Sequence, residues 1–254
     1  MFSEADGYEQ FMGRWSRRLA PKFVEFAQVV RGDLVLDVGS GTGALSLAVS
    51  AIASAQVTGV ERSADYVRYA KEHAENERVR FEVGDASALP FSDSTFDRTL
   101  SMLVLNFVSD PAVALDQMIR VTRPGGVVAA AVWDYGDGME MLHAFWDEAV
   151  ALAPAAAPRD ERHMPLCTRD ALAELWRDHR LRDVDDQPLT IDMEFSSFDD
   201  YWQPFLNAQG PAGVYVASLA ESDRHALQSR LRNRFGNRGF TLRGRAWAVR
   251  GVVT

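Results

Sequence analysis

An apolar segment that runs directly into a glycine-rich loop is the feature that most constrains the fold of this chain. Residues 35–43 read Val-Leu-Asp-Val-Gly-Ser-Gly-Thr-Gly, and an uncharged segment that suits a helix follows at 44–53. Glycine tolerates positive φ and lets the backbone approach a ligand, and the first amides of the next helix have no partners within it. The sequence therefore predicts a buried strand, a ligand-binding turn and a helix, in that order.

Short apolar runs and helix-compatible segments keep alternating from residue 34 to residue 133. This alternation is typical of βα units around a parallel sheet. We expect strands at 34–38, 57–60, 79–83, 96–104 and 126–133, and helices at 44–53, 64–73 and 111–121. Asp110 is a natural N-cap before Pro111, and Arg123-Pro124-Gly125-Gly126 ends that last helix.

The regular alternation lapses after Trp133. There we expect helices at 139–152, 168–179, 198–207 and 218–235, strands at 181–195 and 240–253, and a linker or lid hinge at 153–158. One domain with an insertion after the fifth strand explains this order better than two domains.

Composition excludes several classes of protein. The chain has 254 residues, 47% of them hydrophobic, a net charge of −9 and a single cysteine, Cys167. It has enough apolar residues for a core, too few cysteines for a disulfide framework, and no apolar run that would serve as a secretion signal or cross a bilayer. An acidic protein is a poor general binder of nucleic acid. We expect a soluble cytoplasmic protein without nucleic-acid or membrane partners, and no metal, because no cluster has metal-ligand spacing.

Two carboxylates indicate which ligand the glycine loop binds. In the dinucleotide fingerprint Gly-x-Gly-x-x-Gly the third glycine would stand at Ala44, whereas here it comes one residue earlier. Asp37 would oppose a pyrophosphate and suits a cationic ligand. Glu61 closes the second strand, where a carboxylate accepts hydrogen bonds from ribose hydroxyls; away from such a loop it would be read as a surface residue. Asp85 ends the third strand, either as an acceptor for an adenine amino group or as an ordinary turn residue.

Together these residues resemble the class I S-adenosylmethionine-dependent methyltransferases, and most closely their small-molecule branch. The resemblance spans roughly residues 30 to 135 and rests on residues 36–43, Glu61, Gly84-Asp85-Ala86, Leu89-Pro90-Phe91, Phe96-Asp97 and Arg123-Pro124-Gly125-Gly126. It implies an α/β fold: a doubly wound, Rossmann-like seven-stranded sheet with an antiparallel last strand and an insertion, or lid, after strand five. The cofactor would lie across the carboxyl ends of strands one, two and four.

The resemblance also implies roles for individual residues. The methionine part of S-adenosylmethionine would be held by Asp37, Gly39, Ser40, Gly41 and Gly43, the ribose by Glu61 with Arg62 beside it, and the adenine by Asp85 and Ala86. Ser101 to Leu103 would line the sulfonium side. The N-terminal segment 8–16 resembles a lid in which Tyr8 and Arg14 reach the cofactor, Arg14 near its carboxylate. The alternative for this segment is an amphipathic helix that packs on the sheet.

The domain is accordingly divided into four parts within residues 1–254. An N-terminal lid helix occupies 1–30, the cofactor-binding core 31–135, a substrate-covering insertion and strand 136–210, and a C-terminal helix and strand 211–254.

Methyl transfer from a sulfonium is an in-line displacement, so it depends on alignment and needs at most a weak base. His143 is the best candidate for that base, because it follows strand five and titrates near neutral pH. The sequence 101–106, Ser-Met-Leu-Val-Leu-Asn, lacks the Pro-Pro motif of enzymes that methylate nucleic-acid bases, so a small organic acceptor is favoured. Asn106 either contacts that acceptor or caps a turn. Other candidate contacts, each of which also suits a purely structural role, are Trp133, Asp134, Trp146, His163, Tyr201 and Trp202.

Two other functions are weighed against this one. A nicotinamide-dependent oxidoreductase conflicts with the glycine spacing and with Asp37, and nothing in the motifs favours a non-catalytic methyltransferase-like binding protein.

The charges of the C-terminal region are unevenly distributed. Residues 183–200 hold seven acids and no Lys or Arg, whereas 224–250 hold eight arginines and no acid. We expect these two segments to form paired, solvated surfaces across the last strands rather than a patch for an anionic substrate.

Overall fold

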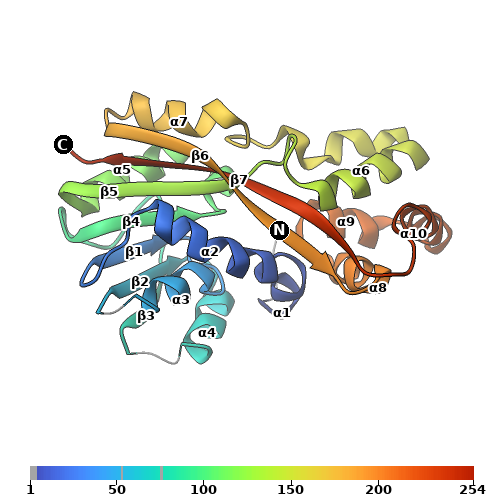
Figure 1. The fold of residues 1–254 in the computed structure, drawn as a ribbon, viewed down its shortest axis with the longest axis horizontal. Coiled ribbons are helices and arrows are strands. Elements are labelled where there is room, and N and C mark those ends of the chain that lie inside the picture. Colours follow the sequence, from blue (N-terminus) through green and yellow to red (C-terminus); the bar gives the residue numbers. More distant parts are fainter. Residues whose placement is uncertain (1–4, 53, 75–76) are drawn as a thin grey trace.

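The computed structural model describes residues 5–52, 54–74 and 77–254, and they form one seven-stranded sheet (Figure 1). The strand order is β3-β2-β1-β4-β5-β7-β6. Strands β1 to β5 run parallel, and β7 is antiparallel to both of its neighbours, β5 and β6. The sheet predicted from the sequence, including its antiparallel last strand, is confirmed. The strands are β1 (Leu34–Val38), β2 (Gln56–Glu61), β3 (Val79–Val83), β4 (Phe96–Met102), β5 (Thr122–Trp133), β6 (Arg182–Phe195) and β7 (Phe240–Val252).

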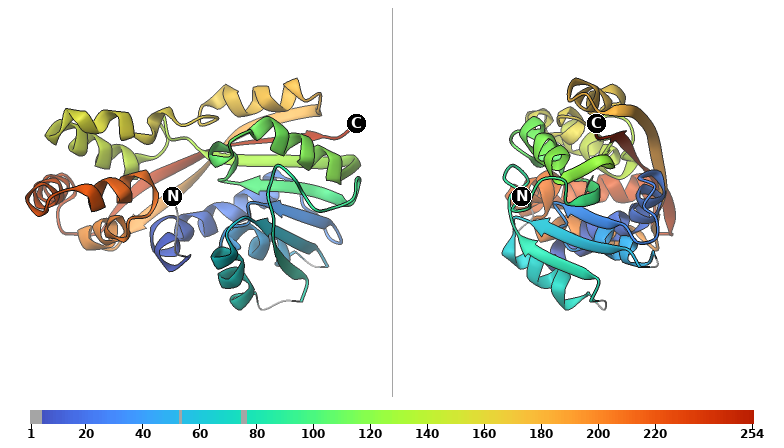
Figure 2. Two further views of the ribbon diagram at one scale, coloured as in Figure 1. Left: turned by 180° about the vertical axis from the view of Figure 1, so that it is seen from behind. Right: turned by 90° about the vertical axis from the view of Figure 1, so that its left-hand side faces the viewer.

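Helices cover both faces of this sheet. In Figures 1 and 2, α2 and α3 lie against one face and α5 and α7 against the other. The α-helices are α1 (Ala5–Tyr8), α2 (Arg14–Phe26), α3 (Ala44–Ser50), α4 (Ala64–Glu72), α5 (Pro111–Val121), α6 (Glu140–Leu152), α7 (Arg169–Asp178), α8 (Phe198–Trp202), α9 (Gly210–Ser218) and α10 (Glu221–Phe235). Short π and 3₁₀ segments are η1 (Glu9–Gly13), η2 (Leu105–Phe107), η3 (Pro154–Arg159), η4 (Glu161–His163) and η5 (Gln203–Asn207).

The register of the central strands places the polar residues at one edge. A parallel sheet that is covered on both faces needs apolar strands, and β1 is buried from Val35 to Val38. Asp37 is the one charged residue of this otherwise apolar strand. It pairs in register with Gly59 of β2 and Leu100 of β4. Because parallel strands end at the same edge, Asp37 and Glu61 both emerge at the carboxyl edge of the sheet.

Strands β6 and β7 form an arm that extends beyond the central strands (Figure 1). They pair from Arg182 and Val252 to Phe195 and Phe240, and α6, α8, α9 and α10 lie around their far end. Aromatic rings fill this end: Phe145 of α6 stacks on Phe205 with 4.7 Å between ring centroids. These rings belong to the same cluster of buried residues that fills the central sheet.

Several boundaries differ from the sequence prediction. β4 stops at Met102 rather than residue 104, because Leu103 takes a positive φ of 66° and the η2 turn follows. The expected linker at 153–158 is largely the 3₁₀ segment η3, and the helix expected at 198–207 becomes a 3₁₀ turn after Trp202. β5 begins at Thr122, four residues early. α3 ends at Ser50, and Ala53 lies outside the described residues.

Helix α9 is absent from the sequence prediction. Its opening Gly210-Pro211 and its internal Gly213 are typical of a loop. Proline is, however, tolerated in the first turn of a helix, and Ala212, Tyr215 and Val216 of α9 are buried in the arm. Tertiary packing therefore overrides the weak local propensity.

Ion pairs join the acid-rich and arginine-rich segments, as expected. Arg250 lies 2.9 Å from Asp185, and Arg232 lies 2.8 Å from Asp199. Further arginines of the segment pair with acids elsewhere: Arg230 with Glu148 and Arg234 with Asp147 of the insertion, and Arg245 with Asp134 just after β5. No helix among the described residues is both long and apolar enough to cross a membrane.

Asp110 caps α5 as predicted, since its Oδ1 accepts hydrogen bonds from the amides of Ala112 and Val113, each at 3.1 Å. We predict that Asp110→Ala lowers the free energy of unfolding by about 1 kcal/mol, because those amides lose their acceptor. Urea denaturation measures this change. Asp116→Ala, an exposed acid within the same helix, is the control and changes stability by less than about 0.5 kcal/mol. Equal losses in the two variants would contradict the capping role.

Candidate functional site

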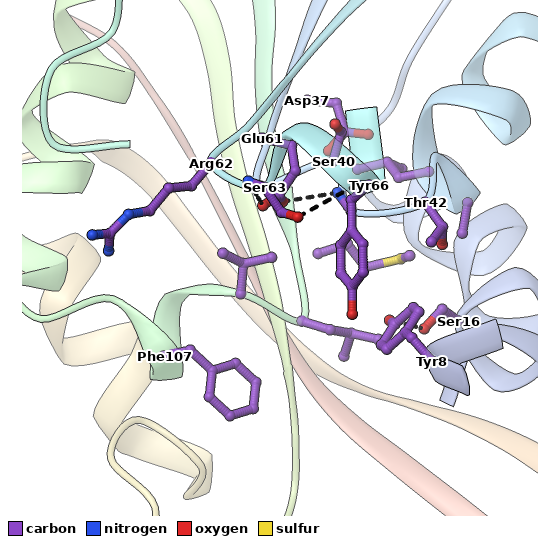
Figure 3. Close-up of a pocket in the computed structure, with 17 residues that line it drawn as sticks. Tyr8, Ser16, Asp37, Ser40, Thr42, Glu61, Arg62, Ser63, Tyr66 and Phe107 are labelled. Carbon is purple, nitrogen blue, oxygen red and sulfur yellow. Dashed lines mark hydrogen bonds between the residues drawn. The ribbon is translucent and has the colours of Figure 1, made fainter. Parts of the chain in front are cut away.

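A cavity of about 390 Å³ opens at the carboxyl ends of β1, β2 and β4 (Figure 3). The predicted cofactor residues that line it are Tyr8, Asp37, Gly39, Ser40, Gly41, Glu61, Arg62 and Leu103. Met102 and Thr42, which lie within the predicted segments 101–103 and 39–43, also line it. The lining residues that the sequence prediction missed are Ser16, Ala44, Leu45, Ser63, Tyr66, Val104 and Phe107. The N-terminal helices, the glycine loop, the start of α4 and the end of β4 therefore enclose one space.

A second cavity of about 180 Å³ adjoins the first. Asp85 and Ala86, the residues predicted for the adenine, line this second cavity. The two cavities share Gly39, Glu61, Arg62, Val104 and Phe107 and so form two parts of one cleft. The Asp85 carboxylate also accepts a hydrogen bond from the amide of Ser87 at 2.8 Å, which fixes the turn after β3.

The glycine loop brings bare backbone to the cleft. Gly39 has a φ of 76°, and a Cβ at this position would collide with the side chain of Val104. The amides of Gly39 and Ser40 both donate to the carbonyl oxygen of Val60, at 2.7 and 3.0 Å, and bend the loop toward β2. Gly41, with a φ of 54°, has only open space where a side chain would be. A ligand can therefore approach the backbone there without obstruction.

Asp37 is a buried acid at the base of the cavity. Its residue is 1% exposed, and its Oδ2 accepts a hydrogen bond from Ser46 Oγ at 2.7 Å. Burial raises the pKa of Asp37 to about 7, and the nearby charge of Glu61 adds to this effect, while the hydrogen bonds from Ser46 oppose it. No ion pair to Asp37 exists among the described residues. A cationic ligand group would supply the missing partner.

Glu61 holds two parts of the cleft together. One carboxylate oxygen accepts from the amide of Gly41 at 3.1 Å, and the other accepts from the amide of Ser63 at 2.8 Å. The carboxylate thus connects the glycine loop to the start of α4 (Figure 3). Each oxygen of an ionised carboxylate accepts more than one hydrogen bond, so both can still receive a ligand hydroxyl.

Two tyrosines close the cavity from the side of the N-terminal segment. The Tyr8 hydroxyl lies 3.0 Å from Ser16 Oγ of α2, and the rings of Tyr8 and Tyr66 are 5.7 Å apart. Burial raises the pKa of Tyr8 to about 12. Tyr66 follows the N-cap Ser63 of α4 by three residues. That spacing, which places it near the end of β2, is the one signal in the sequence that would have pointed to it.

Comparison with known proteins identifies the family. The sequence pattern of the methyltransferase domain matches residues 36–130. An uncharacterised protein of Mycobacterium tuberculosis is 31% identical over 214 residues, which are 80% of this chain and 74% of that protein. A demethylmenaquinone methyltransferase of Renibacterium salmoninarum is 34% identical over 146 residues, which are 58% of this chain and 59% of that enzyme. The chain belongs to the class I S-adenosylmethionine-dependent methyltransferases.

Solved structures share the fold of this methyltransferase. A putative methyltransferase from an antibiotic biosynthesis pathway of Anabaena variabilis matches with a TM-score of 0.65 and 19% identity, over 91% of this chain and 96% of that one. As a member of the family, the present chain uses S-adenosylmethionine as its cofactor. The cleft fits this group: Asp37 is a buried acid with no cationic partner among the described residues, the loop is open at Gly41, and a second cavity adjoins the first.

Three predicted cofactor residues lie outside the lining of both cavities. Arg14 is bound to Asp200, with Nη1 2.6 Å from Oδ1, and its guanidinium lies over the ring of Trp15 at 4.3 Å. The structure thus gives Arg14 an ion pair in place of the predicted cofactor contact. Ser101 is fully buried within β4, and the next residues of the chain line the cavity instead. Gly43 packs against the ring of Phe81.

The structure agrees in part with each of the two alternatives for the N-terminal segment, the lid and the amphipathic helix. α2 buries Trp15, Leu19 and Phe23 as an amphipathic helix would. Tyr8 and Ser16 nevertheless line the cavity, as expected of a lid. The segment therefore packs on the sheet and closes the cleft at the same time.

His143 also lies outside the lining of both cavities. Its Nε2 is 2.8 Å from the carbonyl oxygen of Tyr135, so that N–H group donates a hydrogen bond to the backbone. This contact occupies the side chain and does not support the predicted role as a base. The acceptor-contact candidates Trp133, Trp146, Tyr201 and Trp202 are buried in the core, and Asp134 pairs with Arg245. His163 ends η4, and Asn106, which is buried, has its amide 4.0 Å from Met164 Sδ.

The raised pKa of Asp37 predicts a dependence of stability on pH. The unfolded chain releases this proton near pH 4, whereas the folded protein keeps it until about pH 7. The folded state therefore binds more protons in this window, and the free energy of unfolding falls as pH rises from about 4 to about 7. Relative to Asp37→Asn, the wild type should lose up to about 4 kcal/mol across that range, in the absence of cofactor.

Urea unfolding at several pH values measures the difference between the two proteins. Glu161, whose pKa burial also raises to about 7, is present in both and cancels. Asp65→Asn, an exposed acid of α4, is the matched control. A wild-type curve parallel to that of Asp37→Asn would show that Asp37 is ionised in the folded protein throughout the range.

Proposed function

We propose that this methyltransferase transfers the methyl group of S-adenosylmethionine to an oxygen, nitrogen or carbon atom of a small organic acceptor. The observation that carries the proposal is the buried acid Asp37 beside the open glycine loop, in a cavity that lies next to a second one. Two relatives support a small acceptor by their names. One is the demethylmenaquinone methyltransferase, and the other is a 2-methyl-6-phytyl-1,4-hydroquinone methyltransferase of Synechocystis, 34% identical over 120 residues, or 38% of that enzyme.

The proposed division of the cleft follows its two cavities. Asp37 would pair with the ammonium of the methionine part, beside the backbone of the loop from Gly39 to Gly43. Glu61 would accept hydrogen bonds from the ribose hydroxyls while its amide contacts keep it in place. Asp85 and Ala86 would line the adenine part. The two carboxylates suit the positive charge and the hydroxyl groups of this cofactor.

When bound, the cofactor supplies a methyl group on a positively charged sulfur. The chain's own part is to align the acceptor with that methyl group and to keep water away. Met102, Leu103 and Val104, at the end of β4, form an apolar wall of the cavity, and the ring of Phe107 stands at its side (Figure 3). An apolar wall excludes water from the reacting atoms and holds them in line.

The lining supports a reaction that depends on alignment more than on acid–base chemistry. Tyr8 stays protonated at neutral pH because burial raises its pKa to about 12. Asp37 and Glu61 are the carboxylates among the described residues of the cavity, and both are proposed for the cofactor. A net charge of −9 and arginines paired with acids favour a small acceptor over a nucleic acid.

We predict that Asp37→Ala and Glu61→Ala each raise the Kd of S-adenosylmethionine more than about tenfold, the scale of a lost hydrogen bond to a charged group. Isothermal titration calorimetry measures the Kd. Asp65→Ala, an exposed acid paired with Arg68, is the control and leaves the Kd unchanged. Wild-type affinity in both variants would remove these two residues from the cofactor site.

His143→Ala tests the base predicted from the sequence. Because His143 is bound to the backbone outside both cavities, we predict that the variant keeps the cofactor Kd and at least about a third of the methylation rate. A base contributes a factor of about 100 or more. The rate is measured with radioactive S-adenosylmethionine and a panel of phenols and quinols. A loss of 100-fold with unchanged Kd would restore His143 as the base.

A further inference from the structure

The Tyr66 hydroxyl is a buried polar group without a hydrogen-bond partner among the described residues. Tyr66 is 7% exposed and lines the larger cavity. Its ring points from α4 toward Tyr8 and Ser16 (Figure 3). A buried hydroxyl that forms no hydrogen bond costs free energy, so native proteins satisfy nearly all such groups. A ligand in this cavity would supply the missing partner.

The Tyr66 hydroxyl can donate a hydrogen bond to that ligand. Burial raises its pKa above the ordinary value of 10, and the neighbouring Tyr8, Glu61 and Glu9 raise it further. The hydroxyl thus keeps its proton at physiological pH. Its proton has no acceptor among the described residues, so an acceptor atom of the ligand would satisfy it.

The charges of the cavity lining offer a partner for one charged group of the methionine part but not for the other. The methionine part of S-adenosylmethionine carries an ammonium and a carboxylate. Asp37 suits the ammonium, but among the described lining residues the one arginine or lysine is Arg62, which is exposed and points away from Asp37 and Tyr66 (Figure 3). Arg14, predicted for the carboxylate, is held by Asp200. Neutral donors are left to bind the carboxylate.

Two other hydroxyls of the lining, those of Ser16 and Ser40, are less suitable donors. Ser16 Oγ already lies 3.2 Å from the carbonyl oxygen of Met12 and 3.0 Å from the Tyr8 hydroxyl. Ser40 Oγ also has no partner among the described residues, but its Cβ packs against Gly59 of β2. Tyr66 lies on the first turn of α4.

We propose that the Tyr66 hydroxyl donates a hydrogen bond to the carboxylate of the methionine part of the bound cofactor. Contact with the Tyr8 ring, 5.7 Å away, positions the Tyr66 ring for this bond. The neutral phenol takes the place that an arginine was expected to fill. The proposal rests on the cofactor sites of the proposed function, but it does not depend on the identity of the methyl acceptor.

The test compares two ligands that differ only in the carboxylate. S-adenosylhomocysteine has it, and the decarboxylated form of S-adenosylhomocysteine keeps the ammonium, sulfur, ribose and adenine. Tyr66→Phe removes only the hydroxyl. We expect this variant to raise the Kd of S-adenosylhomocysteine about tenfold or more, the range for a hydrogen bond to a charged group, and to leave the Kd of the decarboxylated ligand within about twofold of wild type.

Tyr69→Phe is the matched control, because Tyr69 lies one turn later on α4 and stacks on His73 outside the cavity. It should change neither Kd. An unchanged Kd for S-adenosylhomocysteine in Tyr66→Phe, or equal losses for both ligands, overturns the proposal. Normal binding of the decarboxylated ligand shows that the variant is folded. Failure of wild-type protein to bind S-adenosylhomocysteine would instead refute the proposed function.

Discussion

The end of β1 is the point on which the rest of the site depends. Asp37 is buried there, and Gly39 then turns the chain so that two successive amides bond to the carbonyl of Val60. The buried carboxyl has Ser46 as its hydrogen-bond partner but no cation among the residues that the structure describes. Its burial costs stability in the free protein. Binding of a cationic group would relieve that cost, which couples the stability of the chain to its ligand.

The sheet and its functional edge could be predicted from the sequence, because local patterns encode them. Apolar runs, glycines and strand-end acids lie close together along the chain, and parallel βα units bring the ends of strands to one edge. Asp37, Glu61 and Asp85 were therefore placed at the cleft from their positions alone. The N-cap Asp110 could be predicted for the same reason, since its carboxylate and the amides that donate to it are at most three residues apart.

Features that depend on distant residues could not be predicted in this way. Arg14 and its partner Asp200 are 186 residues apart in the sequence, and no local pattern predicts such a pair. Tyr66 looks like an ordinary helix residue until the N-terminal segment is placed beside it. α9 owes its helical form to packing in the arm rather than to its glycines and proline. In each case the tertiary environment decides what the local sequence leaves open.

The arm formed by β6 and β7 links two regions of the molecule. The cleft is built by the carboxyl ends of β1, β2 and β4, whereas the helices of the insertion pack around the far end of the arm through rings such as Phe145 and Phe205. The two regions are nevertheless joined, because Arg14 of α2 pairs with Asp200 of α8 and the ring of Phe11 meets the ring of Phe205 at 5.1 Å. A change at the far end of the arm can therefore reach the cleft through the N-terminal segment, which also carries Tyr8 and Ser16 into the lining of the cavity.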